Sequence, residues 1–203
     1  ILAHRGYFPV AELATFRRLG TRLQGHPTTA EGLPGVRVAS GSLGQGLSVA
    51  VGVAQAKKLA NDNHLVYVLM GDGEQEEGQI WEAAMYAPAK NVDNIVAIVD
   101  YNKEQIDGPT DDVLSLGDLR AKYESFGWKV WECNGNDMQE LVDTFNKIRE
   151  NAHKGQSQIL LAHTEMGMGV DFMMGTHKWH GVAPIDEQAA NALTQLKEAL
   201  GDY

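Results

Sequence analysis

Two short apolar runs, each followed at once by polar residues, stand out in the hydrophobic pattern of the chain. Leu65 to Met70 leads into Gly71-Asp72-Gly73, and Ile95 to Val99 leads into Asp100-Tyr101-Asn102-Lys103. Runs this short, bounded by Gly and Asn, predict buried strands rather than helices. Between them, apolar residues recur at helical spacing from Gly78 to Lys90, which predicts a strand, a helix and a strand. A crossover of this length joins parallel strands, whose carboxyl ends meet at one edge of a sheet.

The same alternation of elements continues through the rest of the chain. Further helices are expected at Ala11–Leu19, after Gly46 to about Ala60, and at Leu116–Phe126, Asp137–Ala152 and Ile185–Leu200; further strands are expected at Val36–Ala39, Trp128–Glu132 and Gln158–His163. Alternating strands and helices predict an α/β fold: a doubly wound, mostly parallel sheet with helices on both faces. One domain over residues 1–203 is the expected organisation.

Composition and charge restrict the classes of partner. A net charge of -10, with no cluster of Lys and Arg, argues against nucleic acid. No apolar run approaches the ~18 residues of a membrane span, and no secretory leader opens the chain. The only cysteine, Cys133, suits a reducing compartment or a core position, so a cytoplasmic location is expected. The chain opens on Ile1 rather than Met, and we expect that an N-terminal portion is missing.

The polar residues after the two strands predict a cation site. Glycines on both sides of Asp72 allow a sharp turn and close approach of a ligand. Asn102 follows the next strand and offers an amide oxygen, and the main-chain carbonyl of Glu104 offers a third oxygen. Three protein oxygens around Mg²⁺ leave positions that substrate phosphates and water commonly fill. We therefore expect a metal-bridged diphosphate at this edge of the sheet.

Several stretches, taken in order, resemble the transketolase family. They are Gly25-His26-Pro27, Gly41-Ser42-Leu43-Gly44-Gln45-Gly46, Gly71-Asp72-Gly73 through Glu76-Glu77-Gly78, Asn102-Lys103 with Ile106-Asp107-Gly108, and Trp179-His180-Gly181. The Gly-Asp-Gly with an Asn about 30 residues later is similar to the thiamine-diphosphate-binding motif. The resemblance covers nearly the whole chain and is strongest to the N-terminal, thiamine-diphosphate-binding subunit of a split transketolase, without its first segment.

This resemblance implies roles for individual residues. Asp72, the Asn102 side chain and the Glu104 carbonyl would bind Mg²⁺ or Ca²⁺. Gly41, Ser42, Leu43 and Gly73 would line the cofactor, with Leu43 against its ring system and Gly73 at the diphosphate. His180 would contact the diphosphate and the substrate, His26 would hydrogen-bond the sugar, and Glu77 and Glu82 would lie at a subunit interface that links two active sites.

Simpler interpretations accompany these assignments. His26 before proline is also compatible with an ordinary loop residue. His177 and His180 are three apart, but no Cys or carboxylate stands at a spacing that would complete a zinc site. Glu74 and Glu76 are interpreted as a solvated acidic helix start, favoured by the helix dipole. The methionines of the glycine-rich loop Thr164–Pro184 are interpreted as flexible packing.

The resemblance also implies an activity and a partner. A transketolase moves a two-carbon ketol unit from a ketose phosphate to an aldose phosphate, as in the pentose phosphate pathway. The glutamate that activates thiamine diphosphate lies in a pyrimidine-binding domain, which does not follow Tyr203. We therefore expect activity only with a C-terminal subunit that carries this domain, in an α2β2 assembly. Two alternatives stay open: another thiamine-diphosphate enzyme such as deoxyxylulose-phosphate synthase, and a non-catalytic module that binds Mg-diphosphate.

Overall fold

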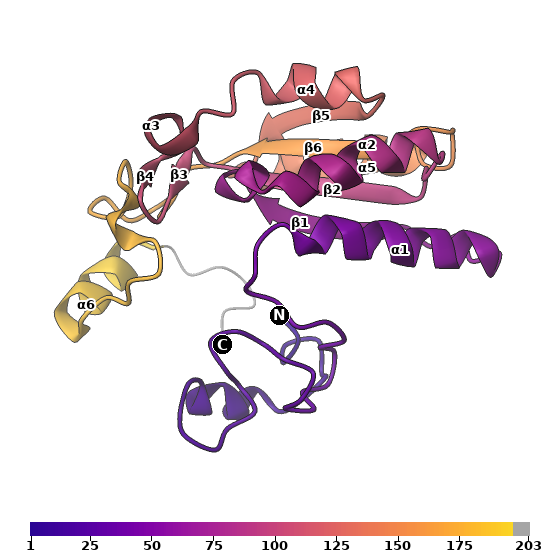
Figure 1. The fold of residues 1–203 in the computed structure, drawn as a ribbon. Coiled ribbons are helices and arrows are strands. Elements are labelled where there is room, and N and C mark those ends of the chain that lie inside the picture. Colours follow the sequence, from indigo (N-terminus) through magenta and orange to yellow (C-terminus); the bar gives the residue numbers. More distant parts are fainter. Residues whose placement is uncertain (197–203) are drawn as a thin grey trace. The chain divides into compact units, whose positions relative to one another are not determined.

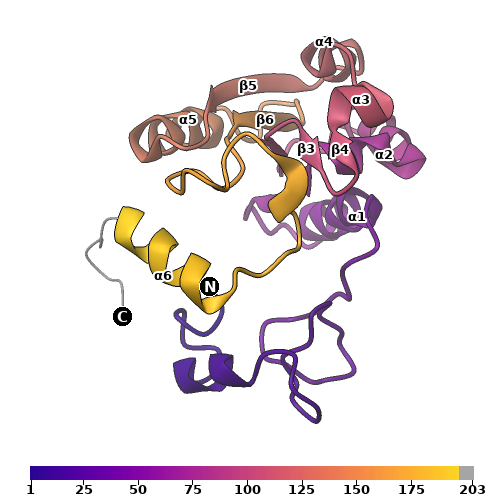
Figure 2. The same cartoon turned by 90° about the vertical axis from the view of Figure 1, so that its left-hand side faces the viewer.

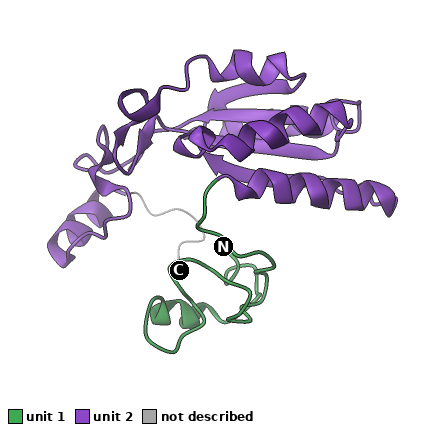
Figure 3. Cartoon of the chain, in the orientation of Figure 1, with its two compact units in different colours: residues 1–43 green, residues 44–203 purple. Residues whose placement is uncertain are grey.

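A computed structural model describes residues 1–196 of the chain. By the density of internal contacts the chain divides into two compact units, residues 1–43 and residues 44–203 (Figure 3). The expectation of a single domain over residues 1–203 stays a prediction, and the two units are described separately below.

A parallel sheet forms the centre of the second unit. Its strands are β1 (Val66–Gly71), β2 (Ile95–Tyr101), β5 (Lys129–Asn134) and β6 (Gln158–His163). Their order across the sheet is β1-β2-β6-β5, and every neighbouring pair is parallel (Figure 1). All four strands therefore end at one edge, as expected from the sequence.

Helices cover both faces of this sheet. The helices of this unit are α1 (Gln45–Leu59), α2 (Gly78–Ala89), α3 (Thr110–Leu114), α4 (Leu119–Ser125), α5 (Met138–Glu150) and α6 (Asp186–Gln195), with the short 3-10 helices η2 (Gly73–Glu76) and η3 (His177–Trp179). One buried cluster joins the sheet to α1, α2 and α4, and a second joins the other face to α5. Figure 2 shows α5 on the side of the sheet away from α1 and α2. The doubly wound α/β fold is confirmed.

Acidic caps set the starts of two helices. The Asp137 side chain accepts hydrogen bonds from the N–H groups of Gln139 and Glu140, at 2.9 and 3.1 Å, and begins α5 where the sequence predicts it. Asp118 likewise accepts from the Ala121 N–H at 2.8 Å, so α4 begins at Leu119. The prediction of a helix from Leu116 began too early, because Gly117 has a positive φ of 56°.

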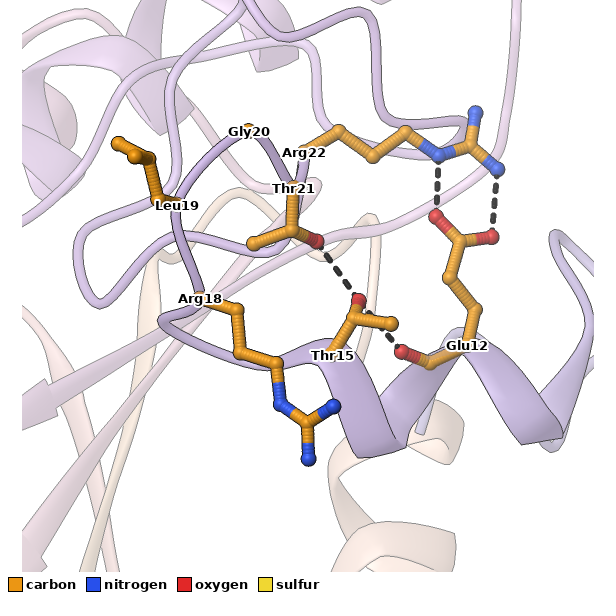
Figure 4. Close-up of a pocket in the computed structure, with 7 residues that line it drawn as sticks. All are labelled: Glu12, Thr15, Arg18, Leu19, Gly20, Thr21 and Arg22. Atoms are coloured by element: carbon orange, nitrogen blue, oxygen red, sulfur yellow. Dashed lines mark hydrogen bonds and ion pairs between the residues drawn. The ribbon is translucent and has the colours of Figure 1, made fainter.

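The first unit has little regular structure. Its one helix among residues 1–43 is the 3-10 helix η1 (Val10–Thr15), and Ala3, Phe8 and Leu23 form its small buried cluster. Arg22 donates to both carboxylate oxygens of Glu12, at 2.5 and 2.8 Å. These two side chains border a pocket of about 460 Å³, which is also lined by Thr15, Arg18, Leu19, Gly20 and Thr21 (Figure 4).

Two predictions of secondary structure were wrong, and one element was missed. Residues 36–39 form no strand, because the first unit has no neighbouring strand to accept their hydrogen bonds. The helix expected at Ala11–Leu19 is the shorter η1. A two-stranded antiparallel hairpin of β3 (Glu104–Gln105) and β4 (Gly108–Pro109) was not expected. The last expected helix, Ile185–Leu200, is present as α6, and residues 197–200 lie outside the described part of the chain.

Membrane-spanning helices were not expected, and the helices within residues 1–196 are all too short or too polar to cross a bilayer.

Tyr123 links the core to the segment after Asp72. Its ring is fully buried, its hydroxyl donates to Gln75 Oε1 at 2.6 Å, and Gln75 Nε2 donates to the Gly71 carbonyl at 3.0 Å. Tyr123→Phe leaves the buried Gln75 oxygen without a donor and is expected to lower the free energy of unfolding by about 1–3 kcal/mol. Tyr86→Phe is the control, because the Tyr86 side chain is exposed and loss of its hydroxyl should cost less than about 0.5 kcal/mol. Urea denaturation measures both, and equal stabilities would contradict the role given to Tyr123.

Candidate functional site

Asp72 lies buried at the end of β1, with only 2% of its surface exposed. Its carboxylate accepts hydrogen bonds from the N–H groups of Gly73, at 2.7 Å, and of Lys103. The Asp72 N–H in turn donates to the Asp100 carbonyl of β2 at 3.2 Å. These contacts hold the carboxylate between the ends of two neighbouring strands, as the parallel arrangement predicts.

The turn after β2 presents oxygen atoms beside Asp72. Asn102 Oδ1 accepts the Glu104 N–H at 2.8 Å, which fixes the orientation of the amide. Lys103 between them has a positive φ of 63°, a conformation that costs a non-glycine residue about 1–2 kcal/mol. The Lys103 carbonyl accepts the Thr110 N–H at 3.0 Å, so a hydrogen bond from the first residue of α3 helps to hold the strained turn.

Asp100 and Thr164 support this turn, and neither was singled out from the sequence. The Thr164 hydroxyl, just after β6, donates to Asp100 Oδ1, and Asn102 Nδ2 lies 3.4 Å from Asp100 Oδ2. Asp100 therefore holds the Nδ2 atom of Asn102, and the Oδ1 atom is directed into the turn, where it accepts the Glu104 N–H. The position of Asp100 near the end of a buried strand was the available signal, because polar residues at strand ends share one edge of the sheet.

A divalent cation fits these residues. The pKa of the Asp72 carboxyl is raised above its usual value. Burial and the nearby Asp100 charge raise this pKa, and together they outweigh the hydrogen bonds from the Lys103 and Gly73 N–H groups, which lower it. Neither Asp72 nor Asp100 forms an ion pair with another side chain of residues 1–196. A cation would therefore offset the burial of the Asp72 charge and the repulsion between the two carboxylates. Within residues 1–196 no three His, Cys, Asp or Glu side chains are grouped so that they could hold a metal. The expected ligands do not require such a group, because they are one carboxylate, one side-chain amide oxygen and one main-chain carbonyl oxygen.

The glycine and the acids after Asp72 have partners distant in the sequence. A Cβ at Gly73 would meet the Gln105 side chain at 3.0 Å, so the backbone there approaches the hairpin closely. Glu74 accepts the N–H groups of Gly44 and Gly71, at 2.7 and 3.1 Å, and Glu76 accepts Gln105 Nε2 at 2.6 Å. Both acids lie in the first turn of η2, as interpreted, but they are half-buried and hydrogen-bonded, so the interpretation of them as solvated was wrong. Local sequence carried no sign of partners about 30 residues away.

His180 is exposed and directly follows η3. Its N–H donates to the His177 carbonyl at 2.9 Å, which makes the two histidines one turn. His177 Nδ1 lies 4.0 Å from Glu104 Oε2, and η3 packs beside β4. The helical turn that carries His180 is thus adjacent to the hairpin of the expected cation ligand Glu104.

Glu77 and Glu82 begin and line the exposed side of α2. Glu77 precedes the helix, and a Cβ at Gly44 would lie 2.7 Å from its Cβ. Glu82 borders a shallow groove of about 320 Å³ between α1 and α2, together with Gly52 and Tyr86. Both glutamates are exposed in this chain. Their role at a subunit interface stays a prediction.

The remaining expected site residues belong to the first unit. His26 and Gly41 lie side by side, because a Cβ at Gly41, where φ is 118°, would meet His26 Cδ2 at 2.6 Å. Ser42 and Leu43 follow, and Leu43 is 54% exposed. Contacts of Gly41, Ser42 and Leu43 with a cofactor, and of His26 with the sugar, stay predictions.

Glu132 forms a charged cluster at the surface end of β5. It accepts hydrogen bonds from His163 Nε2 at 2.9 Å and Arg120 Nη1 at 2.7 Å, and these two contacts, His163 first, lower the pKa of the Glu132 carboxyl. Because the pKa of Glu132 is lower in the folded protein than its usual value of 4.5, the ionised carboxylate stabilises the fold at pH values above 4.5. This stabilisation is lost as the pH falls through the pKa of the folded protein.

Glu132→Gln should therefore lower the free energy of unfolding near neutral pH by about 1 kcal/mol or less, because the side chain is a third exposed. The difference from the original protein should shrink as the pH falls below the usual value of the carboxyl. Denaturation at a series of pH values measures it, and a difference that does not change with pH would contradict the assignment.

Comparison with known proteins places this arrangement beside transketolases. Residues 1–202 match the family model described as "Transketolase, thiamine diphosphate binding domain". The chain is 42% identical over 199 residues to one subunit of the apulose-4-phosphate transketolase of Phocaeicola vulgatus, covering 98% of this chain and 69% of that relative. It is 37% identical to the 6-deoxy-6-sulfo-D-fructose transketolase subunit SqwG of a Clostridium species, over 97% of this chain and 70% of that one.

Solved structures agree with the sequence matches. The transketolase of Campylobacter jejuni superposes with a TM-score of 0.82 at 30% identity, covering 91% of this chain. The chain spans about 70% of the length of the two related subunits and 29% of the length of the Campylobacter jejuni transketolase. These relatives favour transketolase chemistry over deoxyxylulose-phosphate synthase and over a non-catalytic binding module.

Proposed function

Because this chain belongs to the transketolase family, whose thiamine diphosphate-binding domain it matches over residues 1–202, we propose that it is the diphosphate-binding part of a transketolase. The reaction is transfer of a two-carbon ketol unit from a ketose phosphate to an aldose phosphate. The observation that carries this proposal is the buried Asp72 carboxylate at the carboxyl edge of the sheet, which has no ion-pair partner within residues 1–196 and lies beside the fixed amide of Asn102.

In this proposal the chain's own residues bind and orient the cofactor. Asp72, Asn102 Oδ1 and the Glu104 carbonyl would hold Mg²⁺ or Ca²⁺, and the backbone at Gly73 would lie at the diphosphate. Gly41, Ser42 and Leu43 line the rest of the cofactor. When bound, thiamine diphosphate supplies the stabilised carbanion that the transfer of a ketol unit requires.

Two histidines act on the sugar side of the reaction. His180 would contact the diphosphate and the substrate, and His26 would hydrogen-bond the sugar oxygens near the reacting carbon. Both side chains are exposed in this chain, so they are free to meet a ligand. In this role they orient the substrate and contribute through proximity and hydrogen bonding.

We also propose a partner subunit that carries the pyrimidine-binding domain. Glu77 and Glu82 lie at a subunit interface that links two active sites, in an α2β2 assembly. This assembly is in the cytoplasm, where the single buried Cys133 stays reduced. The names of the two relatives, each described as one subunit of a transketolase, support this proposal. Catalysis then needs both chains, because the group that activates the cofactor comes from the partner.

Mixing the full-length protein with its candidate partner tests the function. Ketol transfer is assayed with a panel of ketose phosphate donors and aldose phosphate acceptors that includes apulose 4-phosphate. The proposal expects transfer only when both chains, thiamine diphosphate and a divalent cation are present. Full activity without the partner would overturn the partner requirement. Binding of the cofactor without transfer in any complex would instead support a non-catalytic module.

A further inference from the structure

The Glu104 side chain contains an unusual buried oxygen. Its Oε2 atom is shielded from solvent and has no hydrogen-bond partner within residues 1–196, while the side chain as a whole is 18% exposed. Buried polar atoms in native proteins nearly always have a partner, and an unpaired charged oxygen is more costly than a neutral one. Cation binding by the main-chain carbonyl of Glu104 gives this carboxylate no role. The unpaired oxygen therefore calls for a partner that is close but not yet in contact.

His177 is the group in position to be that partner. Its Nδ1 lies 4.0 Å from Glu104 Oε2, about 1 Å beyond the length of an ordinary hydrogen bond. The two residues belong to neighbouring elements, since β3 of Glu104 pairs with β4, and η3 of His177 packs beside β4. A small movement of η3 toward the hairpin closes the gap without any change of fold.

Each residue of the pair is tied to one half of the proposed site. The Glu104 N–H donates to Asn102 Oδ1, and its carbonyl is a proposed cation ligand. The His177 carbonyl accepts the N–H of His180 at 2.9 Å, so the two histidines move as one turn. A contact between Glu104 and His177 would therefore connect the cation ligands to the histidine that faces the diphosphate.

We propose that Glu104 and His177 form a hydrogen bond that fixes η3 against the cation-binding turn and so places His180 at the diphosphate. His177 is then a positioning residue, because it acts through His180 and touches neither cofactor nor substrate. This proposal rests on the proposed function for its ligand, and on the described contacts alone for the pairing itself. The pairing makes the Glu104 side chain, as well as its carbonyl, part of the site.

A double-mutant cycle in the full-length protein tests the pairing. The variants are Glu104→Ala, His177→Ala and the double substitution, with Glu104→Gln as the variant that retains a hydrogen-bond acceptor. Affinity for thiamine diphosphate in the presence of Mg²⁺ is measured by calorimetry. Each alanine variant should bind about tenfold more weakly, as supporting groups of metal sites typically do. The double variant should bind no more weakly than either single one, and Glu104→Gln should recover part of the loss.

A second readout needs no cofactor. Hydrogen exchange at the amides of residues 177–180 should be faster in each alanine variant than in the original protein, and no faster in the double variant. His64→Ala is the control, since that histidine lies before β1, at the opposite end of the strands, and should change neither readout. Additive effects of Glu104→Ala and His177→Ala on exchange, or no effect, would overturn the pairing.

The two readouts also separate this inference from the proposed function. If the original protein fails to bind thiamine diphosphate while exchange shows coupling between Glu104 and His177, the proposed function is wrong and the pairing stands. If it binds the cofactor and the effects on affinity are additive, the proposed function stands and the pairing is wrong.

Discussion

Asp72→Ala is expected to abolish cation-dependent binding of thiamine diphosphate. The substitution removes the only carboxylate of the proposed ligand set and leaves the Gly73 and Lys103 N–H groups without their acceptor. N–H donors without an acceptor cannot supply the negative charge that a cation needs. Because supporting residues of metal sites alone change affinity about ten- to a hundredfold, loss of this ligand should weaken binding by at least about a hundredfold.

Calorimetric titration of thiamine diphosphate, with Mg²⁺ and with a chelator, measures this effect. Asp107→Ala is the matched control, because Asp107 is an exposed acid on the neighbouring hairpin. Asp72→Asn separates charge from size: it should bind as weakly as Asp72→Ala if the negative charge holds the cation. Unchanged affinity in Asp72→Ala would remove Asp72 from the site.

His180→Ala is expected to lower kcat/KM for ketol transfer by about a hundredfold in the complex of both chains. His180 follows η3 directly and is exposed, so its ring is available to a ligand. The proposed contacts reach both diphosphate and substrate. Affinity for thiamine diphosphate should fall much less than turnover, since the cation ligands remain.

Steady-state kinetics with saturating cofactor, beside a cofactor titration, separate the two effects. His64→Ala serves as the control, because its histidine is exposed and lies before β1. A loss of affinity that accounts for the whole loss of activity would make His180 a binding residue alone. Normal kcat/KM would exclude it from the site.

The parallel sheet was predictable because its strands are short apolar runs, and the two central strands, β2 and β6, are largely buried. Continuous apolar runs such as Leu65–Met70 and Ile95–Val99 match β1 and β2 to within two residues at each end. The placement of Asp72 beside the turn of Asn102 followed from the geometry of parallel strands, without any knowledge of partners. The Asp137 cap was readable for a different reason, since a cap is a local interaction.

Long-range interactions and irregular chain were less accessible. The sequence around Glu74 predicts a solvated acid, because the N–H group that it binds belongs to Gly44, which lies far away along the chain. Residues 36–39 have an alternating pattern but no neighbouring strand, and pattern alone does not supply one. The support of Asn102 by Asp100 and Thr164 joins the ends of β2 and β6, which only the strand order reveals.

A crystal of the full-length protein grown with thiamine diphosphate and Mn²⁺ in place of Mg²⁺ gives the most direct test of the site. Anomalous scattering locates the metal independently of any assumption about its ligands. We predict one peak within about 2.0–2.3 Å of the Asp72 carboxylate, Asn102 Oδ1 and the Glu104 carbonyl oxygen, with the diphosphate on its open side. A peak bound by other residues, or ordered cofactor with no metal at Asp72, would contradict the account.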